Sequence, residues 1–348
     1  MNEHEAPAYR AAGVDLRAAD QVVERLKPLA AETATAHVES GLGSFGGFFA
    51  YPDVGGEQLL IASIDGVGTK MKVARLTGAW EAAGYDIVSH CVDDILVHGA
   101  QPLFFLDYIG TAALDVEAIA ALGRGMADAC REAGCALLGG ETAEMPGVYC
   151  PGEIDLVGCI VGSVRRSALL SGDRVRPGDQ LIGLASNGLH TNGYSLARKL
   201  LLEGGPGGDF RLPDGQTVAA ALSARHRMYR SAVAPLLERP ELHAMAHITG
   251  GGIPGNLVRV LPRDCRARVA VDAWERPPIF RLLAEQGVDP LEMHRVFNMG
   301  IGWILAVASE VAEAWETELR ERGERAWRIG EVSPGARGVE LTGLGGAG

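Results

Sequence analysis

The chain has 348 residues, of which 47% are hydrophobic and 22% are charged, and its formal net charge is −12. This composition is typical of a globular protein, and a negative charge without a basic cluster argues against nucleic-acid binding. At roughly 150 residues per domain, the length predicts two domains, which we place at residues 1–168 and 169–342. Residues 343–348 have almost nothing to bury and are expected to be a disordered tail.

The predicted compartment follows from features that the sequence lacks. No apolar stretch approaches the length of a membrane span, and the polar, acidic start does not resemble a secretory signal, so we expect a cytoplasmic protein with no membrane partner. The six cysteines form no C-x-x-C pair, and most of them lie inside apolar runs. We therefore expect free thiols that pack as small hydrophobic side chains.

Strands and helices are expected to alternate in both halves, which predicts the α/β class, of the α+β type. In the first half, an amphipathic helix and a glycine-rich loop precede a buried strand at 59–64, and the alternation continues to residue 164. A polar stretch at 165–179, with two turn signals, is the predicted linker. The main elements expected in the second half are strands at 181–185, 245–248, 267–271 and 301–307, a long helix at 218–237, and a helix at 311–322.

A glycine turn joins the strand at 59–64 to a helix that starts near Thr69. Gly66 and Gly68 would let the backbone approach a ligand, and Lys70 adds a positive charge beside the free amides of the helix start. Asp65 carries the wrong charge for a phosphate ligand and would instead hold a divalent cation. The segment predicts a phosphate site, but its spacing is not that of a P-loop, and an ordinary glycine turn with a solvated lysine is the alternative.

The next helix, expected at 84–99, carries four polar residues of interest. Residues placed at 100° intervals around its axis form one apolar stripe. Asp86, His90 and Asp93 then fall on the opposite side, which we expect to face solvent, whereas Asp94 lies at the margin of the buried stripe. Because burying an unpaired carboxylate is costly, Asp94 is the better candidate for a cation ligand. Asp93 is expected to be solvated or to lie behind the ligand shell.

Two glycines after another apolar strand deliver Glu141 to the end of that strand. With Asp65 and Asp94 it could supply oxygen ligands for a Mg²⁺ ion that bridges nucleotide phosphates. The sequence shows no His/Cys set of the kind that zinc requires. In the alternative interpretation, Glu141 and Glu144 only cap the turn.

Two corners in the second half are rich in hydrogen-bond donors. One is the strand-to-helix corner at 186–193, and the other is the glycine segment at 247–252, whose amides precede a helix and predict a second anion site. Two anion sites imply two phosphorylated ligands. His190 and His247 are the histidines in these corners, which makes them acid/base candidates, with a purely hydrogen-bonding role as the alternative.

Six motifs occur in an order that resembles one enzyme family. They are DGVGTK at 65–70, PLFFLDY at 102–108, GGETAEMPG at 139–147, NGYSL at 192–196, HITGGG at 247–252 and FNMG at 297–300. Over residues 9–332 the chain resembles the phosphoribosylformylglycinamidine cyclo-ligases, also called aminoimidazole ribonucleotide synthetases, of purine biosynthesis. GGETAEMPG and PLFFLDY separate it from selenophosphate synthetase and thiamine-monophosphate kinase, which share the fold.

The resemblance implies an ATP-dependent ring closure that converts formylglycinamidine ribonucleotide to aminoimidazole ribonucleotide, ADP and phosphate. The γ-phosphoryl group would first move to the formamide oxygen, and the amidine nitrogen would then attack that carbon and expel phosphate. A related phosphotransferase that closes no ring, and a nucleotide-binding module without catalysis, are the alternatives.

The resemblance also implies roles for individual residues. Asp65, Asp94 and Glu141 would hold Mg²⁺. The residues expected to contact the phosphates of ATP are Gly43, Phe45, Gly46, Gly47, Gly66, Gly68, Thr69 and Lys70. Those expected to bind the ribose phosphate of the substrate are Thr249, Gly250, Gly251 and Gly252, with His190, Asn192 or His247 near the reacting formamide. Family members are homodimers whose N-terminal strands pair into a barrel across the interface, beside a C-terminal mixed sheet flanked by helices.

Overall fold

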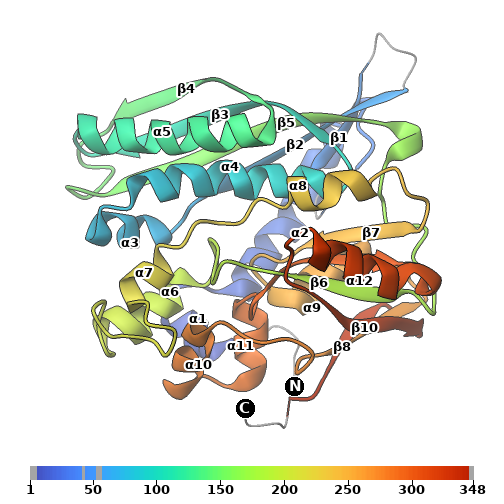
Figure 1. Ribbon diagram of the computed structural model, residues 1–348. Coiled ribbons are helices and arrows are strands. Elements are labelled where there is room, and N and C mark those ends of the chain that lie inside the picture. Colours follow the sequence, from blue (N-terminus) through green and yellow to red (C-terminus); the bar gives the residue numbers. More distant parts are fainter. Residues whose placement is uncertain (1–5, 41–43, 52–56, 345–348) are drawn as a thin grey trace.

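The computed structural model describes residues 6–40, 44–51 and 57–344, and it contains two sheets, each with its own hydrophobic core (Figure 1). The first sheet has the strand order β1-β2-β5-β3-β4, and all its pairs are antiparallel except β3 with β4. Its strands are β1 (Gly47–Ala50), β2 (Gln58–Gly66), β3 (Gln101–Thr111), β4 (Ala136–Glu144) and β5 (Ile154–Arg165).

The second sheet has the order β11-β8-β10-β6-β9-β7, and all its pairs are antiparallel except β11 with β8. Its strands are β6 (Gln180–Ala185), β7 (Leu242–His247), β8 (Cys265–Ala270), β9 (Ile301–Val307), β10 (Ala326–Pro334) and β11 (Gly338–Thr342). Every residue of β7, at the edge of this sheet, and of its neighbour β9 is buried, so both faces of these two strands are covered. The predicted mixed C-terminal sheet flanked by helices is confirmed.

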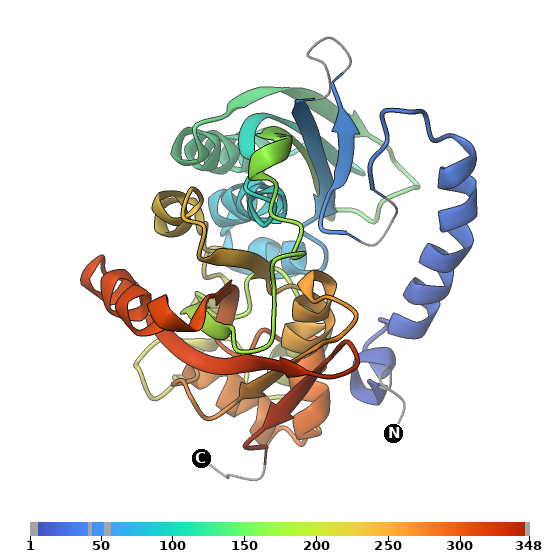
Figure 2. The same ribbon diagram turned by 90° about the vertical axis from the view of Figure 1, so that its right-hand side faces the viewer.

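Helices lie beside both sheets. In the first half they are α1 (Pro7–Ala11), α2 (Leu16–Glu32), α3 (Lys70–Thr77), α4 (Trp80–Leu96) and α5 (Val116–Ala133). In the second half they are α6 (Tyr194–Arg198), α7 (Val218–Leu222), α8 (Arg230–Val233), α9 (Gly252–Leu257), α10 (Pro278–Glu285), α11 (Pro290–Val296) and α12 (Ala312–Glu321). Figure 2 shows α2 along one side of the molecule, where Val22, Leu26 and Leu29 are exposed.

Helix α4 is the layer between the first sheet and the C-terminal half of the chain (Figure 1). Every residue from Ala83 to Leu96 is buried. The prediction that Asp86, His90 and Asp93 face solvent is therefore wrong. One side of α4 packs on β2, β5 and α5, and the side expected to be solvated is covered by segments of the second half.

The long helix predicted at 218–237 is also wrong. The chain forms α7, leaves the helix at Ser223, and becomes helical again only at α8. Side chains of α4 bind the backbone of the intervening segment: Asp86 Oδ1 accepts from the amide of His226 at 2.6 Å, and Asp93 Oδ1 accepts from the amide of Tyr229 at 3.0 Å. These bonds replace helical ones, so the segment runs across α4 in an irregular conformation.

The first sheet has one covered face and one open face. In β5 the residues alternate between buried and half-buried, and the buried set faces α4. On the other face, Ile64 and Leu106 are 68% and 37% exposed, and both pair in register with Cys159 between them. The five strands do not close into a barrel within one chain.

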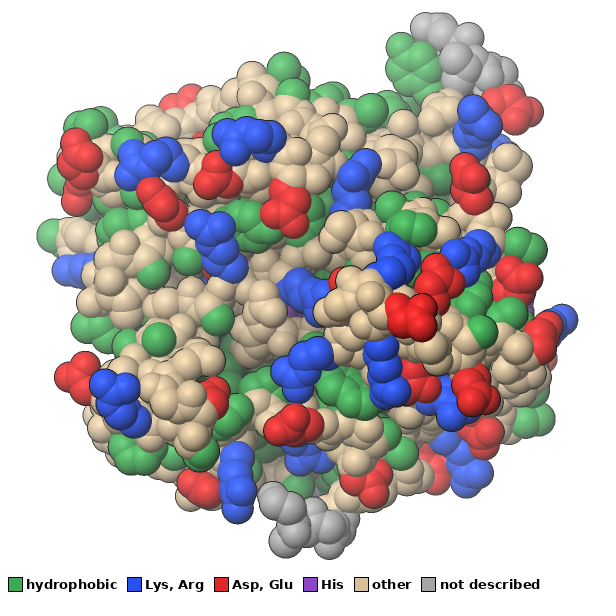
Figure 3. Space-filling view, in the orientation of Figure 1, with side chains coloured by type: hydrophobic (Ala, Val, Ile, Leu, Met, Phe, Trp, Pro, Cys, Tyr) green, Lys and Arg blue, Asp and Glu red, His purple; other side chains and the backbone are tan. Residues whose placement is uncertain are grey.

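Two further predictions can be compared with the described residues. Leu344 packs against the larger core, so the tail is ordered at least that far, and residues 345–348 lie outside the described part. Among the described residues, none of the helices has the length and apolar character needed to cross a membrane. Figure 3 shows acidic and basic side chains interspersed over one face of the molecule.

Candidate functional site

Asp65 and Asp94 meet at the junction of β2 and α4. The alternation along β2 places Ser63 and Asp65 on the face that α4 covers, and the Ser63 hydroxyl lies 3.3 Å from a carboxylate oxygen of each aspartate. Burial raises the pKa of Asp94 well above its usual value, His90 opposes this shift, and Asp65 adds to it. A divalent cation between the two carboxylates would offset the cost of charging them, so the pair fits the predicted Mg²⁺ ligands.

The structure does not bring Glu141 to this pair within one chain. Asp65 pairs through Gly158 and Asp107 with Gly140, so β4 lies three strand spacings, or about 14 Å, from β2. Glu141 is one residue further along β4, and its side chain therefore points to the opposite, open face. The three-carboxylate site expected from the sequence is not formed by a single copy, because a strand reverses its side-chain direction at each residue.

Lys70 is buried, which contradicts its expected contact with phosphate. Its ammonium nitrogen lies 2.7 Å from Asp86 Oδ2, 2.8 Å from the carbonyl of His190 and 2.6 Å from the carbonyl of Ala224. These three acceptors take up the three hydrogens of the ammonium group. Lys70 thus ties α3 to α4 and to two loops of the second half, and it has no hydrogen left for a nucleotide.

The other residues expected to bind ATP lie in two loops. Gly43 lies outside the described residues. Phe45 is buried under the guanidinium of Arg259, which is 4.9 Å from the ring centroid, and Gly46 is held so close to Ile61 that a Cβ would lie 2.9 Å from its side chain. Gly47 begins β1 and is exposed.

In the second segment, Gly66 at the end of β2 and Gly68 just after it are exposed, so a ligand can reach their backbone. The Thr69 hydroxyl lies 3.0 Å from the hydroxyl of Ser195 in α6, which connects this loop to the second half.

His247 connects the cation candidates to the predicted anion loop. It is the last residue of β7, is fully buried, and its Nδ1 lies 2.8 Å from Asp94 Oδ1. Burial lowers the pKa of His247 to about 3, so its imidazole is neutral at pH 7. The glycine loop begins two residues after His247, so this histidine connects the carboxylate pair to that loop.

The loop at 249–252 is shaped by a buried asparagine. Asn256 donates to the carbonyls of Thr249, Gly250 and Gly252, at 3.3, 3.2 and 2.8 Å. Gly251 and Gly252 both have positive φ values, 95° and 61°, which side chains other than glycine rarely adopt. The amide of Gly252 donates within the loop to the carbonyl of Thr249 at 3.1 Å, so the amides of Gly250 and Gly251 are the candidates for an anion site. Asn192 lies beside this loop and is partly exposed, with its Oδ1 next to Gly250.

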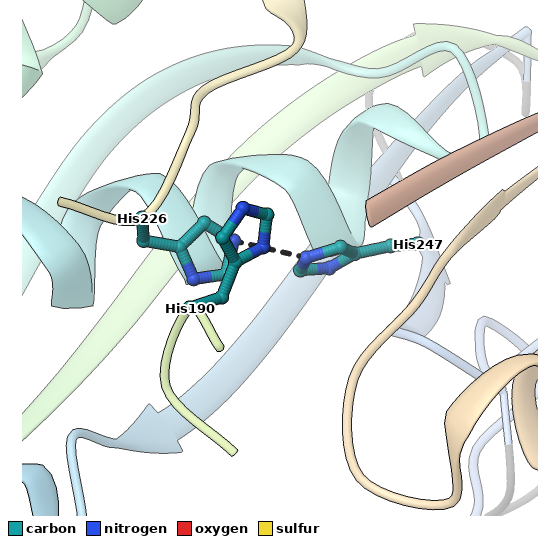
Figure 4. Close-up of side chains that lie close together, drawn as sticks. All are labelled: His190, His226 and His247. Carbon is teal, nitrogen blue, oxygen red and sulfur yellow. Dashed lines mark hydrogen bonds between the residues drawn. The ribbon is translucent and has the colours of Figure 1, made fainter. Parts of the chain in front are cut away.

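Four histidines gather behind the carboxylates. His190, His226 and His247 are drawn in Figure 4, where the dashed line joins Nε2 of His226 to Nε2 of His247 at 3.1 Å. The fourth, His90, lies on α4 with its Nε2 3.7 Å from Asp65 Oδ1. His190 and His247, the predicted acid/base residues, are 1% and 0% exposed, so neither side chain lies at the surface.

Sequence reasoning missed His226 and misplaced His90. His226 lies inside the segment assigned to a long helix, and His90 on a helix face assigned to solvent. Apolar periodicity could not have found either one, since both depend on how α4 meets the second half. One signal in the sequence could have indicated that this face is covered by protein: α4 carries many polar residues for a helix beside a buried strand.

Both halves of the chain match known domain families. Residues 47–164 match the family described as AIR synthase related protein, N-terminal domain, and residues 176–341 match its C-terminal domain. A phosphoribosylformylglycinamidine cyclo-ligase of Bordetella pertussis is 47% identical over 98% of this chain and 99% of its own length. The chain belongs to the phosphoribosylformylglycinamidine cyclo-ligase family. Another cyclo-ligase, from Myxococcus xanthus, is 50% identical over 94% of this chain and 96% of its own length.

Solved structures of more distant proteins share the fold of this cyclo-ligase family member. A thiamine-monophosphate kinase from Stenotrophomonas maltophilia has a TM-score of 0.64 at 20% identity, over 92% of this chain and 95% of its own. The hydrogenase maturation protein HypE in complex with ATP has a TM-score of 0.59 at 23% identity, over 82% of this chain and 83% of its own. At these identities the likeness describes the fold alone.

Proposed function

We propose that the chain catalyses the ATP-dependent cyclisation of formylglycinamidine ribonucleotide to aminoimidazole ribonucleotide, with release of ADP and phosphate. The observation that carries the proposal is the hydrogen bond between His247 and Asp94. It joins a pair of carboxylates suited to a cation, on the first half, to a glycine loop suited to an anion, on the second half. Phosphoryl transfer between two phosphorylated ligands requires these two features side by side.

In this mechanism Asp65 and Asp94 would hold Mg²⁺, which would supply positive charge to the phosphates of ATP. Glu141 would take part only from a second copy of the chain. The segments at 44–47 and 66–69 would contact the nucleotide through their backbone, while Lys70 supports the site from within the protein. Mg²⁺ prefers oxygen ligands such as these carboxylates, and phosphates bind to the backbone amides of exposed glycine turns.

The second half holds the substrate in the same mechanism. Amides of the loop at 249–252 bind the ribose phosphate, and Asn192 beside that loop orients the formamide for phosphorylation of its oxygen. His247 fixes the position of Asp94 through Nδ1, and His190 lies behind it. Attack of the amidine nitrogen then forms the C–N bond of the ring, and the bond from carbon to the phosphorylated oxygen breaks to release phosphate.

The deciding experiment is a product assay. The chain is incubated with ATP, Mg²⁺ and formylglycinamidine ribonucleotide, and aminoimidazole ribonucleotide and ADP are measured together. Equal amounts of the two products are expected. ADP without the imidazole would contradict cyclisation and favour the phosphotransferase alternative, and neither product would favour a module without catalysis.

Asp94→Asn tests the cation site in the same assay. We expect a loss of about 100-fold or more in kcat/KM, or ~3 kcal/mol, together with a higher Mg²⁺ requirement, because a neutral amide is a weak ligand for this ion. Asp128→Asn, on the exposed side of α5, is the control and should leave both unchanged. An unaltered Mg²⁺ dependence in Asp94→Asn would remove Asp94 from the site.

We also propose that two copies pair through the open face of the first sheet. Exposed Ile64 and Leu106 support this, because apolar residues in one row of a sheet are usually covered by a partner. Light scattering coupled to size exclusion should give the mass of a dimer. Ile64→Lys should reduce it to that of a monomer, and a wild-type monomer would contradict the proposal.

A further inference from the structure

The histidines at the centre of the molecule form a second cluster of metal-ligand type. One ring nitrogen of each of His190, His226 and His247 lies within 4.8 Å of the other two, and all three side chains are buried (Figure 4). They come from three separate segments: the loop after β6, the segment between α7 and α8, and the end of β7. We propose that they form a site for a divalent transition-metal ion of the Zn²⁺ class, distinct from the carboxylate pair.

The spacing of two ligand atoms suits such an ion. Nε2 of His226 and Nε2 of His247 are 3.1 Å apart. Two imidazole nitrogens that bind one tetrahedral zinc ion at about 2.05 Å lie about 3.3 Å from each other. Without an ion, one of the two nitrogens must donate to the other. When an ion is bound, both Nε2 atoms direct their lone pairs at it, and the rings need to move by only a few tenths of an ångström.

Both of these histidines already have the outer partners that zinc-bound histidines have. The Nδ1 of His247 lies 2.8 Å from Asp94 Oδ1, and the Nδ1 of His226 lies 3.3 Å from the hydroxyl of Thr191. A hydrogen on each Nδ1 can be donated to these oxygens, which leaves each Nε2 free to bind the ion. Such bonds fix the tautomer and the orientation of a metal-binding imidazole.

His190 supplies the third nitrogen after a rotation of its ring. Its ring is stacked on that of His226, with centroids 4.1 Å apart, and Nδ1 is buried without a hydrogen-bond partner among the described residues. Its Nε2 accepts from the amide of Asn187 at 3.1 Å. Turning the ring about Cβ–Cγ points Nδ1 at the ion and releases that amide.

The amide that the rotation releases would lie beside a cavity. Asn187 lines a cavity of about 580 Å³, in which water can take the released amide hydrogen. His190 also has a positive φ of 61°, which costs a residue other than glycine about 1 kcal/mol or more and is concentrated at functional positions. Asp93 Oδ2, 3.7 Å from His226 Nε2, is buried without a hydrogen-bond partner among the described residues, so a further oxygen lies beside the site.

The chemistry of the donors selects the class of ion. Three neutral imidazoles favour Zn²⁺, Co²⁺, Ni²⁺ or Cu²⁺, whereas Mg²⁺ prefers the oxygens of Asp65 and Asp94. Burial lowers the pKa values of His190 and His226 well below the usual value, so both rings are neutral and able to bind metal at pH 7. An ion here would occupy His190 and His247, so Zn²⁺ should also inhibit turnover.

The test is metal binding by the full chain, stripped of metal with a chelator. Co²⁺ should produce the visible d–d absorption of a tetrahedral or five-coordinate nitrogen site, Zn²⁺ should abolish it stoichiometrically, and excess Mg²⁺ should not. X-ray absorption of the Zn²⁺ complex should count three imidazole ligands. Absence of the Co²⁺ bands, or a Zn²⁺ shell made mainly of oxygen, would overturn the proposal without any variant.

Three variants locate the ion. His226→Gln should weaken Zn²⁺ binding by more than about 100-fold, beyond the range for loss of an outer partner, and Thr191→Val should weaken it by about 10-fold. His37→Gln removes a partly exposed histidine far along the chain from the cluster and should change nothing. Thermal unfolding checks that each variant is folded. If His226→Gln does not fold, the loss of Zn²⁺ affinity in Thr191→Val decides whether the histidine site binds the ion.

Asp65→Asn separates the two cation sites. It should raise the Mg²⁺ requirement of turnover and leave Zn²⁺ affinity unchanged. If Asp65→Asn weakens Zn²⁺ binding and His226→Gln does not, the ion occupies the carboxylate pair and the histidine site is refuted. Because binding is measured without substrate, this result does not depend on whether cyclisation is found.

Discussion

Helices α4 and α5 lie against the same sheet and have nearly the same length, 17 and 18 residues, yet they differ in every other respect. In α5 the buried residues recur at three- and four-residue intervals, and the other residues are half-buried or exposed. In α4 the whole surface from Ala83 onward is buried, including three carboxylates and one histidine. A polar stripe on a helix therefore does not by itself predict exposure to solvent. On α5 the stripe faces water, and on α4 it faces the second half of the protein.

The largest effect should come from breaking the polar contact that covers α4. In Lys70→Met, Asp86 is left as a buried charge without its partner, which should lower the free energy of unfolding by about 3–5 kcal/mol. Urea unfolding measures it. The double variant Lys70→Met/Asp86→Asn should recover much of the loss, since it removes both charges and keeps an acceptor for the amide of His226. A single variant as stable as wild type would mean that the ion pair does not hold the two halves together.

Contact between the two helices can be tested through their glycines. A Cβ on Gly125 of α5 would lie 1.9 Å from the carbonyl oxygen of Glu81, so Gly125→Ala should destabilise the protein by about 1–3 kcal/mol. Gly123 is on the same helix with no atom near its Cβ position, and Gly123→Ala should instead stabilise by up to ~1 kcal/mol. Calorimetric unfolding of both variants gives the comparison. Equal changes in the free energy of unfolding of the two variants would mean that α4 and α5 move apart to accept the new methyl group without loss of stability.

The pH dependence of stability should reflect the buried histidine just beyond α4. Burial lowers the pKa of His98 to about 4, so the native state binds its proton only below that pH, whereas the unfolded chain binds it near 6.5. Stability from His98 is present above pH 6.5 and is lost as the pH falls toward 4, by ~2 kcal/mol at pH 5. Urea unfolding at pH 7 and pH 5 measures this, and His98→Gln should reduce the difference by about that amount, while the buried His190, His226 and His247 contribute in the same direction. An equally steep loss in that variant would assign it to other groups.

The smallest effect is expected at the exposed end of the same helix pair. Arg124 of α5 lies 2.8 Å from Glu81 in the first turn of α4, and both side chains are about half exposed. Arg124→Met should change the free energy of unfolding by no more than about 1 kcal/mol, and less in high salt. A loss as large as that in Lys70→Met would mean that burial does not distinguish the two pairs.

The local sequence pattern was sufficient to predict an element where its bounds depend on its own residues. The strand predicted at 301–307 is β9, with the same bounds, and the helix predicted at 311–322 is α12 to within one residue at each end. The position of Asp94 at the margin of an apolar stripe indicated a carboxylate that needs a partner. In the structure Asp94 is buried and forms a hydrogen bond with His247.

Local pattern failed where two distant segments meet. The helix predicted at 218–237 is interrupted because carboxylates of α4 bind its backbone, which no periodicity within 218–237 could reveal. The position of Glu141 also depended on the strand order, because one residue along β4 decides which face its side chain occupies.

The sequence by itself determined the family, the glycine corners and the residue types of the site, because motifs and turn chemistry are local properties of the chain. Only the tertiary structure decided which of those residues share one environment. Packing the two halves against α4 buried the charge of Lys70, separated Glu141 from Asp65, and brought three histidines from distant segments within ligand distance of one another. Such groupings are set by contacts between elements, which the order of residues along the chain does not display.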